Sequence, residues 1–340
     1  MKKETLMKKE TLMRKLVAAK GYARRSAQVS ALALIAAVAA ATAPNAVAAT
    51  PTSALTWTAQ PPIPTARGAL ASAVLDGNIY VVGGVTSLET STLKTAEAYD
   101  PRTKHWTRLP PMPTSRGFLA AASLDGQIYA IGGQDTTSYD LATVESYSPA
   151  SGGWRTDAPL LAATGCDAAV AGAGHIYAVG GEDQVGNVVA TLEIYDPKPN
   201  RWALGRSMPT ARELVGVAWS GNRLYAIGGL DNNSDPLSNV EAYDPATNTW
   251  QERAPIPTPR AHPAVGSLND GQIIVAGGGP PSGTADVELY TPSSNTWQKL
   301  TELPVPTDPT GALVGHMFYV ISGFTLGHYA TRSVWAAVVQ

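Results

Sequence analysis

Four arginines occupy one recurring motif in the 340-residue chain. Each ends a Pro-Thr-x-Arg sequence, and the four are Arg67, Arg116, Arg212 and Arg260. A guanidinium group can pair a carboxylate through two parallel hydrogen bonds, so arginines gathered in one place suit the recognition of acidic groups. The alternative is that they are consensus residues that hold neighbouring loops through hydrogen bonds to carbonyls. The sequence leaves both interpretations open.

Two segments interrupt this motif. Thr164-Gly165-Cys166-Asp167 stands where one further arginine is expected, and Asp308-Pro309-Thr310 stands where another is expected. Further polar residues follow a recurring diglycine, and the candidates among them are Asp135, Asp183, Asp231 and Asn232. Carboxylates and amides can bracket sugar hydroxyls, but the same residue types also cap turns. We therefore treat them as candidate ligand residues with that structural alternative beside them.

A period of about 48 residues unites these features. Diglycines fall at 83–84, 132–133, 180–181, 228–229 and 277–278, with Ser322-Gly323 as a degenerate sixth. Six tryptophans are spaced 49, 48, 48, 48 and 47 residues apart, at Trp57, Trp106, Trp154, Trp202, Trp250 and Trp297. Independent landmarks that share one period indicate one structural unit copied six times.

Each unit predicts four strands, which we name a to d. In the first unit they are 70–75, 78–82, 96–99 and 105–109, with Asp76-Gly77 suited to a tight hairpin. A lone four-stranded sheet leaves both apolar faces wet, so the copies must pack face to face, and a closed propeller does this with short edges. A linear solenoid is the alternative. The chain ends favour a ring, because 55–58 predicts a strand d without a blade, and 333–339 predicts a strand c without a strand d.

The units resemble kelch repeats, whose signature is diglycine, then Tyr, then Trp. Five units place Glu-x-Tyr seven residues before the Trp, with glutamates at Glu97, Glu145, Glu193, Glu241 and Glu288. The chain is thus predicted to be an all-β, six-bladed kelch-type β-propeller with four antiparallel strands per blade, closed by an N-terminal strand that completes the C-terminal blade. The expected blades are 63–110, 111–158, 159–207, 208–255, 256–302 and 303–340 plus 54–60.

The resemblance also implies where a ligand binds. In kelch proteins the d-to-a and b-to-c loops share one face, and in similar adaptors arginines ring the channel there and grip acidic peptides. The two interrupted blades, 3 and 6, lie opposite each other in a ring of six. Four arginines with two opposed acidic positions would favour a zwitterionic or polyhydroxylated ligand.

Residues 1–48 predict a secretory signal peptide. Nine Lys or Arg in 1–25 precede a small apolar stretch at 29–43, and Ala46-Val47-Ala48 supplies a small-x-small cleavage pattern. The stretch is short for a membrane span, which needs about 20 residues. Without 1–48 the net charge is near −9, so nucleic acid and anionic lipid are not expected partners. We expect an exported monomer, composed of residues 49–340.

Enzyme chemistry has weaker support. Galactose oxidase has a similar propeller, but its copper site needs two His, two Tyr and a Cys crosslinked to one Tyr. Here only His262 and His328 fall on the loop face, and although they could share a metal with Asp308, no short-range ligand motif supports one. With Cys166 as the only cysteine, no internal disulfide is possible. No metal, cofactor or catalytic residue is predicted.

Two functions remain. The first is a non-catalytic recognition module that binds a protein segment or glycan at the loop face. The second is a carbohydrate-active enzyme, either oxidase-like or similar to the bacterial sialic-acid mutarotases, which also resemble this fold.

Overall fold

The computed structural model describes residues 54–87, 91–137, 139–165, 167–279, 283–324 and 329–339. The predicted signal peptide lies outside these ranges, so its cleavage stays a prediction. All regular structure in the described ranges is β. No helix in this part of the chain is long and apolar enough to cross a membrane.

Six sheets of four antiparallel strands make up the described fold, as the sequence predicts. The sheets, in chain order and from strand a to strand d, are β2 (Ala71–Leu75), β3 (Asn78–Val82), β4 (Ala96–Asp100) and β5 (His105–Arg108); β6 (Ala120–Leu124), β7 (Gln127–Ile131), β8 (Val144–Ser148) and β9 (Gly153–Thr156); β10 (Ala168–Gly172), β11 (His175–Val179), β12 (Leu192–Asp196) and β13 (Arg201–Leu204); β14 (Gly216–Ser220), β15 (Arg223–Ile227), β16 (Val240–Asp244) and β17 (Thr249–Glu252); β18 (Ala264–Ser267), β19 (Ile273–Ala276), β20 (Val287–Thr291) and β21 (Thr296–Lys299); and β22 (Asp308–Val314), β23 (Met317–Phe324), β24 (Val334–Val338) and β1 (Thr58–Ala59).

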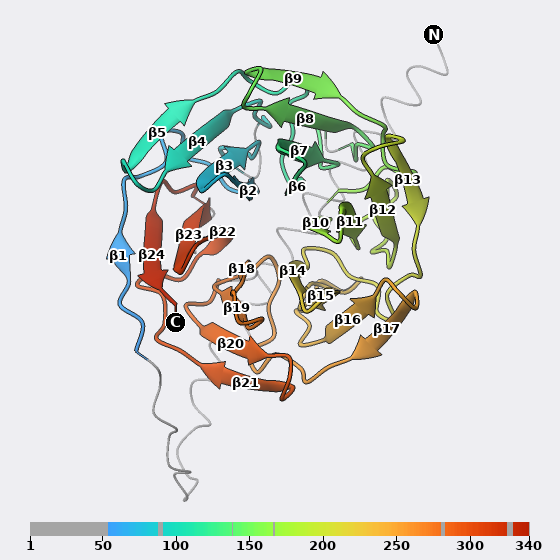
Figure 1. Ribbon diagram of the computed structural model, residues 1–340, viewed down its shortest axis with the longest axis vertical. Helices are drawn as coiled ribbons and strands as arrows, with labels where there is room; N and C mark the ends of the chain where they lie inside the picture. Colours follow the sequence, from blue (N-terminus) through green and yellow to red (C-terminus); the bar gives the residue numbers. More distant parts are fainter. Residues whose placement is uncertain are drawn as a thin grey trace, which may run out of the picture. The chain divides into compact units, whose positions relative to one another are not determined.

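The six sheets form a closed ring (Figure 1). Each innermost strand contacts that of the next blade, from β2 through β6, β10, β14 and β18 to β22, and β22 contacts β2 again. The outermost strands lie at the rim, as Figure 1 shows for β5, β9 and β13. This arrangement brings equivalent loops of all six blades to the same end of the ring.

The N-terminal strand closes the ring by completing blade 6. Thr58 and Ala59 pair with Ala336 and Trp335 of β24, and the Gln60 amide donates to the Val334 carbonyl over 2.8 Å. This strand d is only two residues long and begins at Thr58, whereas the sequence predicted it over 55–58. Closure therefore joins residues about 275 positions apart in the chain.

The periodic aromatic residues hold neighbouring blades together. Tyrosines from adjacent sheets meet in the core, as Tyr99 and Tyr319 do with ring centroids 5.9 Å apart. Each periodic tryptophan donates its indole N–H to a backbone carbonyl of the preceding d-to-a connection. The pairs are Trp57 with Thr301, Trp106 with Pro61, Trp154 with Pro110, Trp202 with Ala158, Trp250 with Arg206 and Trp297 with Ala254. A satisfied N–H in a largely apolar contact explains why tryptophan recurs at this position.

Candidate ligand-binding face

The d-to-a and b-to-c loops lie side by side in the blades. Isolated β-bridges join them, for example between Gly68 and Val85 in blade 1 and between Gly117 and Gln134 in blade 2. The diglycine beside each bridge has positive φ, as at Gly132 and Gly133, so a side chain there would be strained. These bridges agree with the expected shared face, which we call the loop face.

The four arginines do not line this face. Each has a side chain that is almost fully buried and pairs with the Glu-x-Tyr glutamate of its own blade. The pairs are Arg67 with Glu97 at 2.5 Å, Arg116 with Glu145, Arg212 with Glu241 at 2.9 Å, and Arg260 with Glu288 at 2.5 Å. The expectation that these guanidinium groups ring the channel and face a ligand is wrong. They are internal crosslinks. Their hydrogen bonds to backbone carbonyls agree with the alternative interpretation, whereas their pairing with the glutamates was not predicted.

The threonine and the arginine of the Pro-Thr-x-Arg motif both serve this crosslink. In blade 4 the Thr210 hydroxyl donates to one oxygen of Glu241 over 2.7 Å, and Arg212 donates to the other. Arg212 also donates to the carbonyls of Asn239 and Ala226. Burial lowers the pKa of Arg212 to about 10, against the opposing effect of Glu241. The group still carries its charge at neutral pH, so the pair is a buried ion pair with further hydrogen bonds.

Threonines stand in the arginine position of the two exceptional blades. The second glycine of each diglycine donates its amide N–H to a backbone carbonyl at the arginine position of the next blade. The acceptors are Arg116, Arg212 and Arg260 in blades 2, 4 and 5, and Thr164 and Thr307 in blades 3 and 6. Thr164 and Thr307, rather than Asp167 and Asp308, therefore replace arginine. The proposed opposition of two acidic residues in arginine positions is corrected accordingly.

The aspartates that follow the diglycines cap their own loops. One oxygen of Asp135 accepts the amides of Thr137 and Tyr139, one oxygen of Asp183 accepts those of Val185 and Asn187, and one oxygen of Asp231 accepts those of Asn233 and Asp235. Asn232 accepts the amide of Val188 and so joins the loops of blades 4 and 3. All four residues lie on the b-to-c loops, and a role in ligand binding stays a prediction.

A histidine and an aspartate from adjacent blades meet at this end of the ring. Nδ1 of His262 lies 2.5 Å from Oδ1 of Asp308, and each side chain is about one-fifth exposed. Burial disfavours the imidazolium, but Asp308 outweighs it, and the pKa of His262 is raised above its usual value. His328, expected beside them, and Cys166 lie outside the described residues. Within the described ranges no group of three His, Cys, Asp or Glu could hold a metal ion.

His262 has a φ of 49°, which is a property of the repeat. Ala69, Phe118 and Leu214, two residues after the other motif arginines, also have positive φ. Their backbones join adjacent blades, since the Phe118 amide donates to Ala69 and the His262 amide donates to Leu214. The left-handed conformation therefore accompanies a backbone hydrogen bond between adjacent blades. It also sets the backbone direction at His262.

Sequence reasoning missed a group of buried carboxyls between blades 2 and 3. Asp167 is 8% exposed, and neither of its carboxylate oxygens has a hydrogen-bond partner. Burial raises its pKa well above the usual range, and Glu193 and Asp140 add to the shift. Burial likewise raises the pKa of Asp140 to about 6. The missing arginine of blade 3 was the available signal, because it leaves Glu193 without the cation that its four counterparts have.

Most of the exposed large apolar side chains lie on loops of the loop face. Five of them are on d-to-a or b-to-c connections, namely Tyr139, Leu161, Val185, Val305 and Tyr329, whereas Leu204 and Val338 are on strands β13 and β24. Tyr139, Val185 and Tyr329 are 57%, 70% and 76% exposed. Tyr139, Leu161 and Val185 belong to blades 2 and 3 and their connection, whereas Val305 and Tyr329 belong to blade 6 and the connection that leads into it.

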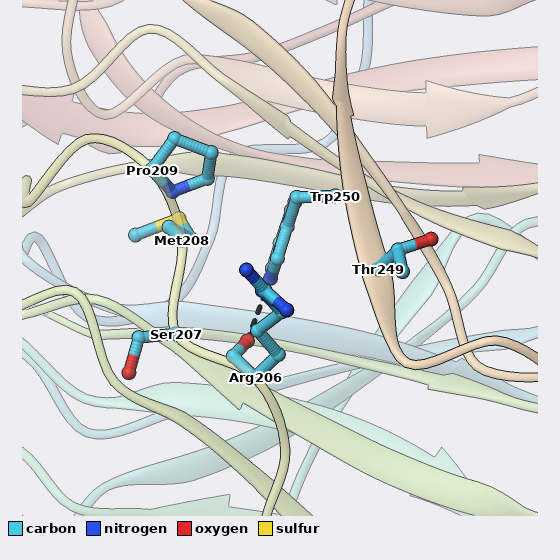
Figure 2. A pocket seen from close by; sticks show the side chains of 6 residues that line it. All are labelled: Arg206, Ser207, Met208, Pro209, Thr249 and Trp250. Atoms are coloured by element: carbon cyan, nitrogen blue, oxygen red, sulfur yellow. Dashed lines mark hydrogen bonds between the residues drawn. The ribbon is translucent and has the colours of Figure 1, made fainter.

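A pocket of about 460 Å³ lies between β17 and the d-to-a connection that leads into blade 4. Its lining residues are Arg206, Ser207, Met208, Pro209, Thr249 and Trp250. Figure 2 shows that the Trp250 indole N–H donates to the Arg206 carbonyl, the same contact that every periodic tryptophan makes. Because it contains none of the predicted ligand residues, we assign this pocket to blade packing.

A closed ring of six four-stranded sheets with loops gathered at one end defines a β-propeller. The family model described as the Kelch motif matches residues 66–113, 115–161, 168–209 and 211–257, which together span more than half of the chain. The chain therefore belongs to the kelch-motif family. No curated protein matches it. Among solved structures, one titled "Structure of YjhT" is similar with a TM-score of 0.70 at 19% identity, over 81% of this chain and 96% of that one. At this identity the similarity shows the fold alone.

Proposed function

We propose that the protein is an exported recognition module that binds a protein segment or glycan at the loop face. The observation that carries this proposal is the placement of Tyr139, Val185 and Tyr329, which are exposed on b-to-c loops of one face. An exposed large apolar side chain costs free energy in water unless a partner covers it. Export rests on the signal-peptide pattern of residues 1–48.

The polar groups on the same loops indicate what the partner offers. Asp135 and Asp183 flank the exposed Tyr139 and Val185 in blades 2 and 3. Since the motif arginines are buried, these aspartates offer a partner hydrogen-bond acceptors and negative charge. Hydroxyl groups of a sugar or cationic side chains of a protein segment complement such a surface, whereas an acidic peptide does not.

A peptide and glycan array tests this function with residues 49–340 as the probe. We expect the wild-type protein to bind and the double variant Tyr139→Ala/Val185→Ser to bind more weakly. Both substitutions remove exposed apolar area from the loop face. Leu204→Ser is the matched control, since Leu204 is equally exposed but lies on the rim strand β13. Equal loss of binding in the control, or array binding untouched by the loop-face variant, would place the interaction elsewhere.

The pair of His262 and Asp308 supports a second candidate, a sugar isomerase. An imidazole oriented by a carboxylate can move protons, which is the chemistry that anomeric interconversion of a sugar requires. NMR exchange measurements on a panel of reducing sugars, including sialic acid, test for turnover. Turnover that is lost in His262→Gln while the fold persists would replace the binding role with a catalytic one.

A further inference from the structure

Blade 3 keeps a buried glutamate but lacks the arginine that neutralises its counterparts. Glu193 is 3% exposed and stands where Glu97, Glu145, Glu241 and Glu288 stand in the other blades. In blade 6 both partners are absent together, because Thr307 replaces the arginine and Trp335 pairs with Val320 in the glutamate position. Blade 3 has lost only the cation.

The acceptors that an arginine uses in the sister blades are still present. In blade 2 Arg116 donates to Glu145 and to the carbonyls of Gly132 and Thr143. Gly180 and Thr191 occupy the matching positions in blade 3, since the Gly180 amide donates to Thr191 as the Gly132 amide donates to Thr143. Glu193 itself accepts only the backbone amides of Leu161 and Ala162.

A second buried carboxyl lies beside this position. Asp167 stands where Leu119 packs in blade 2: a Cβ on Gly83 would meet Leu119, and a Cβ on Gly132 would meet Asp167 at 3.1 Å. A buried carboxyl without a hydrogen-bond partner from another residue is costly, and a nearby cation offsets that cost. Arg116 also interacts with Asp167 electrostatically but is already paired with Glu145.

We propose that blade 3 binds a guanidinium group supplied by a ligand, in the place that Arg116, Arg212 and Arg260 fill in their own blades. Glu193 is the anionic partner, the carbonyls of Gly180 and Thr191 accept the remaining N–H groups, and Asp167 is the neighbouring carboxyl group. Thr164, which stands in the arginine position, is too short to supply this group itself.

A protein segment with an arginine side chain is the source of this group, a conclusion that rests on the proposed binding function. Leu161, whose amide donates to Glu193, is itself 56% exposed on the loop face. Leu161 therefore links the buried Glu193 to the exposed apolar residues proposed to contact a partner. A planar guanidinium group suits these acceptors better than an ammonium group, because an arginine side chain already binds the equivalent glutamate and carbonyls in the sister blades.

Thermal unfolding and calorimetry with methylguanidinium chloride at low millimolar concentration test the site. We expect a saturable rise in Tm for residues 49–340 and no rise with urea, which is a neutral molecule of similar shape. Glu193→Gln should weaken the calorimetric affinity about tenfold or more, as expected when a charged hydrogen-bond partner is lost. Thr164→Arg should fill the site, raise Tm without ligand and abolish the response.

Thr164→Arg keeps the test decisive if Glu193→Gln fails to fold. An absent response in the wild-type protein overturns the inference, and so does an equal response in wild type and Thr164→Arg, which would indicate binding elsewhere. Array binding at the loop face without a methylguanidinium response would remove this inference and leave the proposed function standing. A methylguanidinium response without any array ligand would support the guanidinium site and remove the proposed function.

Discussion

Arg212 and Glu241 lie 2.9 Å apart with both side chains about 99% buried or more. They come from a loop and a strand 29 residues apart in the sequence, and three further blades repeat the pair. The Pro-Thr-x-Arg and Glu-x-Tyr motifs, which are separate landmarks in the sequence, are therefore the two halves of one internal crosslink. This relationship explains why each arginine motif is accompanied by its glutamate.

Breaking one such pair should be costly. In Arg212→Met the Glu241 carboxylate stays buried without its cation, and we expect a loss of about 3–5 kcal/mol in the free energy of unfolding. The double variant Arg212→Met/Glu241→Met should lose less, because it leaves no uncompensated charge. Urea denaturation of all three proteins measures the difference. A double variant less stable than the single one would contradict this account.

The N-terminal strand should stabilise the whole ring. Removal of residues 49–60 exposes the edge of β24 and withdraws Leu55 and Trp57 from the cluster that includes Phe318. We expect a lower Tm and a broader unfolding transition than for a protein that starts at residue 49. If both proteins melt at the same temperature, β1 contributes nothing to closure.

The repeat period made the fold predictable from the sequence. The direction of the arginine side chains could not be predicted from it, so the site could not be predicted either. The spacing of Trp57 to Trp297 gave the number of blades, and the unmatched strands at the two ends gave the closure. The same spacing placed Arg67 and its counterparts on the correct loops but could not show that they turn inward. The near-constant separation of 28 to 30 residues between arginine and glutamate was the signal that could have revealed the pairing. Asp167 was unpredictable for a related reason, because only the packing of blade 2 against blade 3 shows that it is buried.

Asp140 should make the protein less stable as the pH rises from about 4 to about 6. Burial raises its pKa from 3.8 to about 6 in the folded chain, so the native state keeps a proton in this window that the unfolded chain has released. We expect Asp140→Asn to gain on the order of 1 kcal/mol over wild type at pH 7 and little at pH 4. Urea denaturation at the two pH values gives the comparison. A gain of the same size at pH 4 and pH 7 would show that Asp140 does not cause the pH dependence of stability.

Asp308 should control the protonation of His262. Burial alone lowers the pKa of an imidazole, and in the folded protein the contact with Asp308 reverses that effect, so the pKa of His262 is above 6.5. The stabilisation from this pair is fully present below pH 6.5 and is lost as the pH rises through the folded-state pKa. In Asp308→Asn, burial remains without the carboxylate, so the pKa of His262 should fall below 6.5. NMR titration of the imidazole C–H signals measures the shift, with His262→Gln identifying the resonance. An unchanged titration midpoint in Asp308→Asn would show that another group sets the charge of His262.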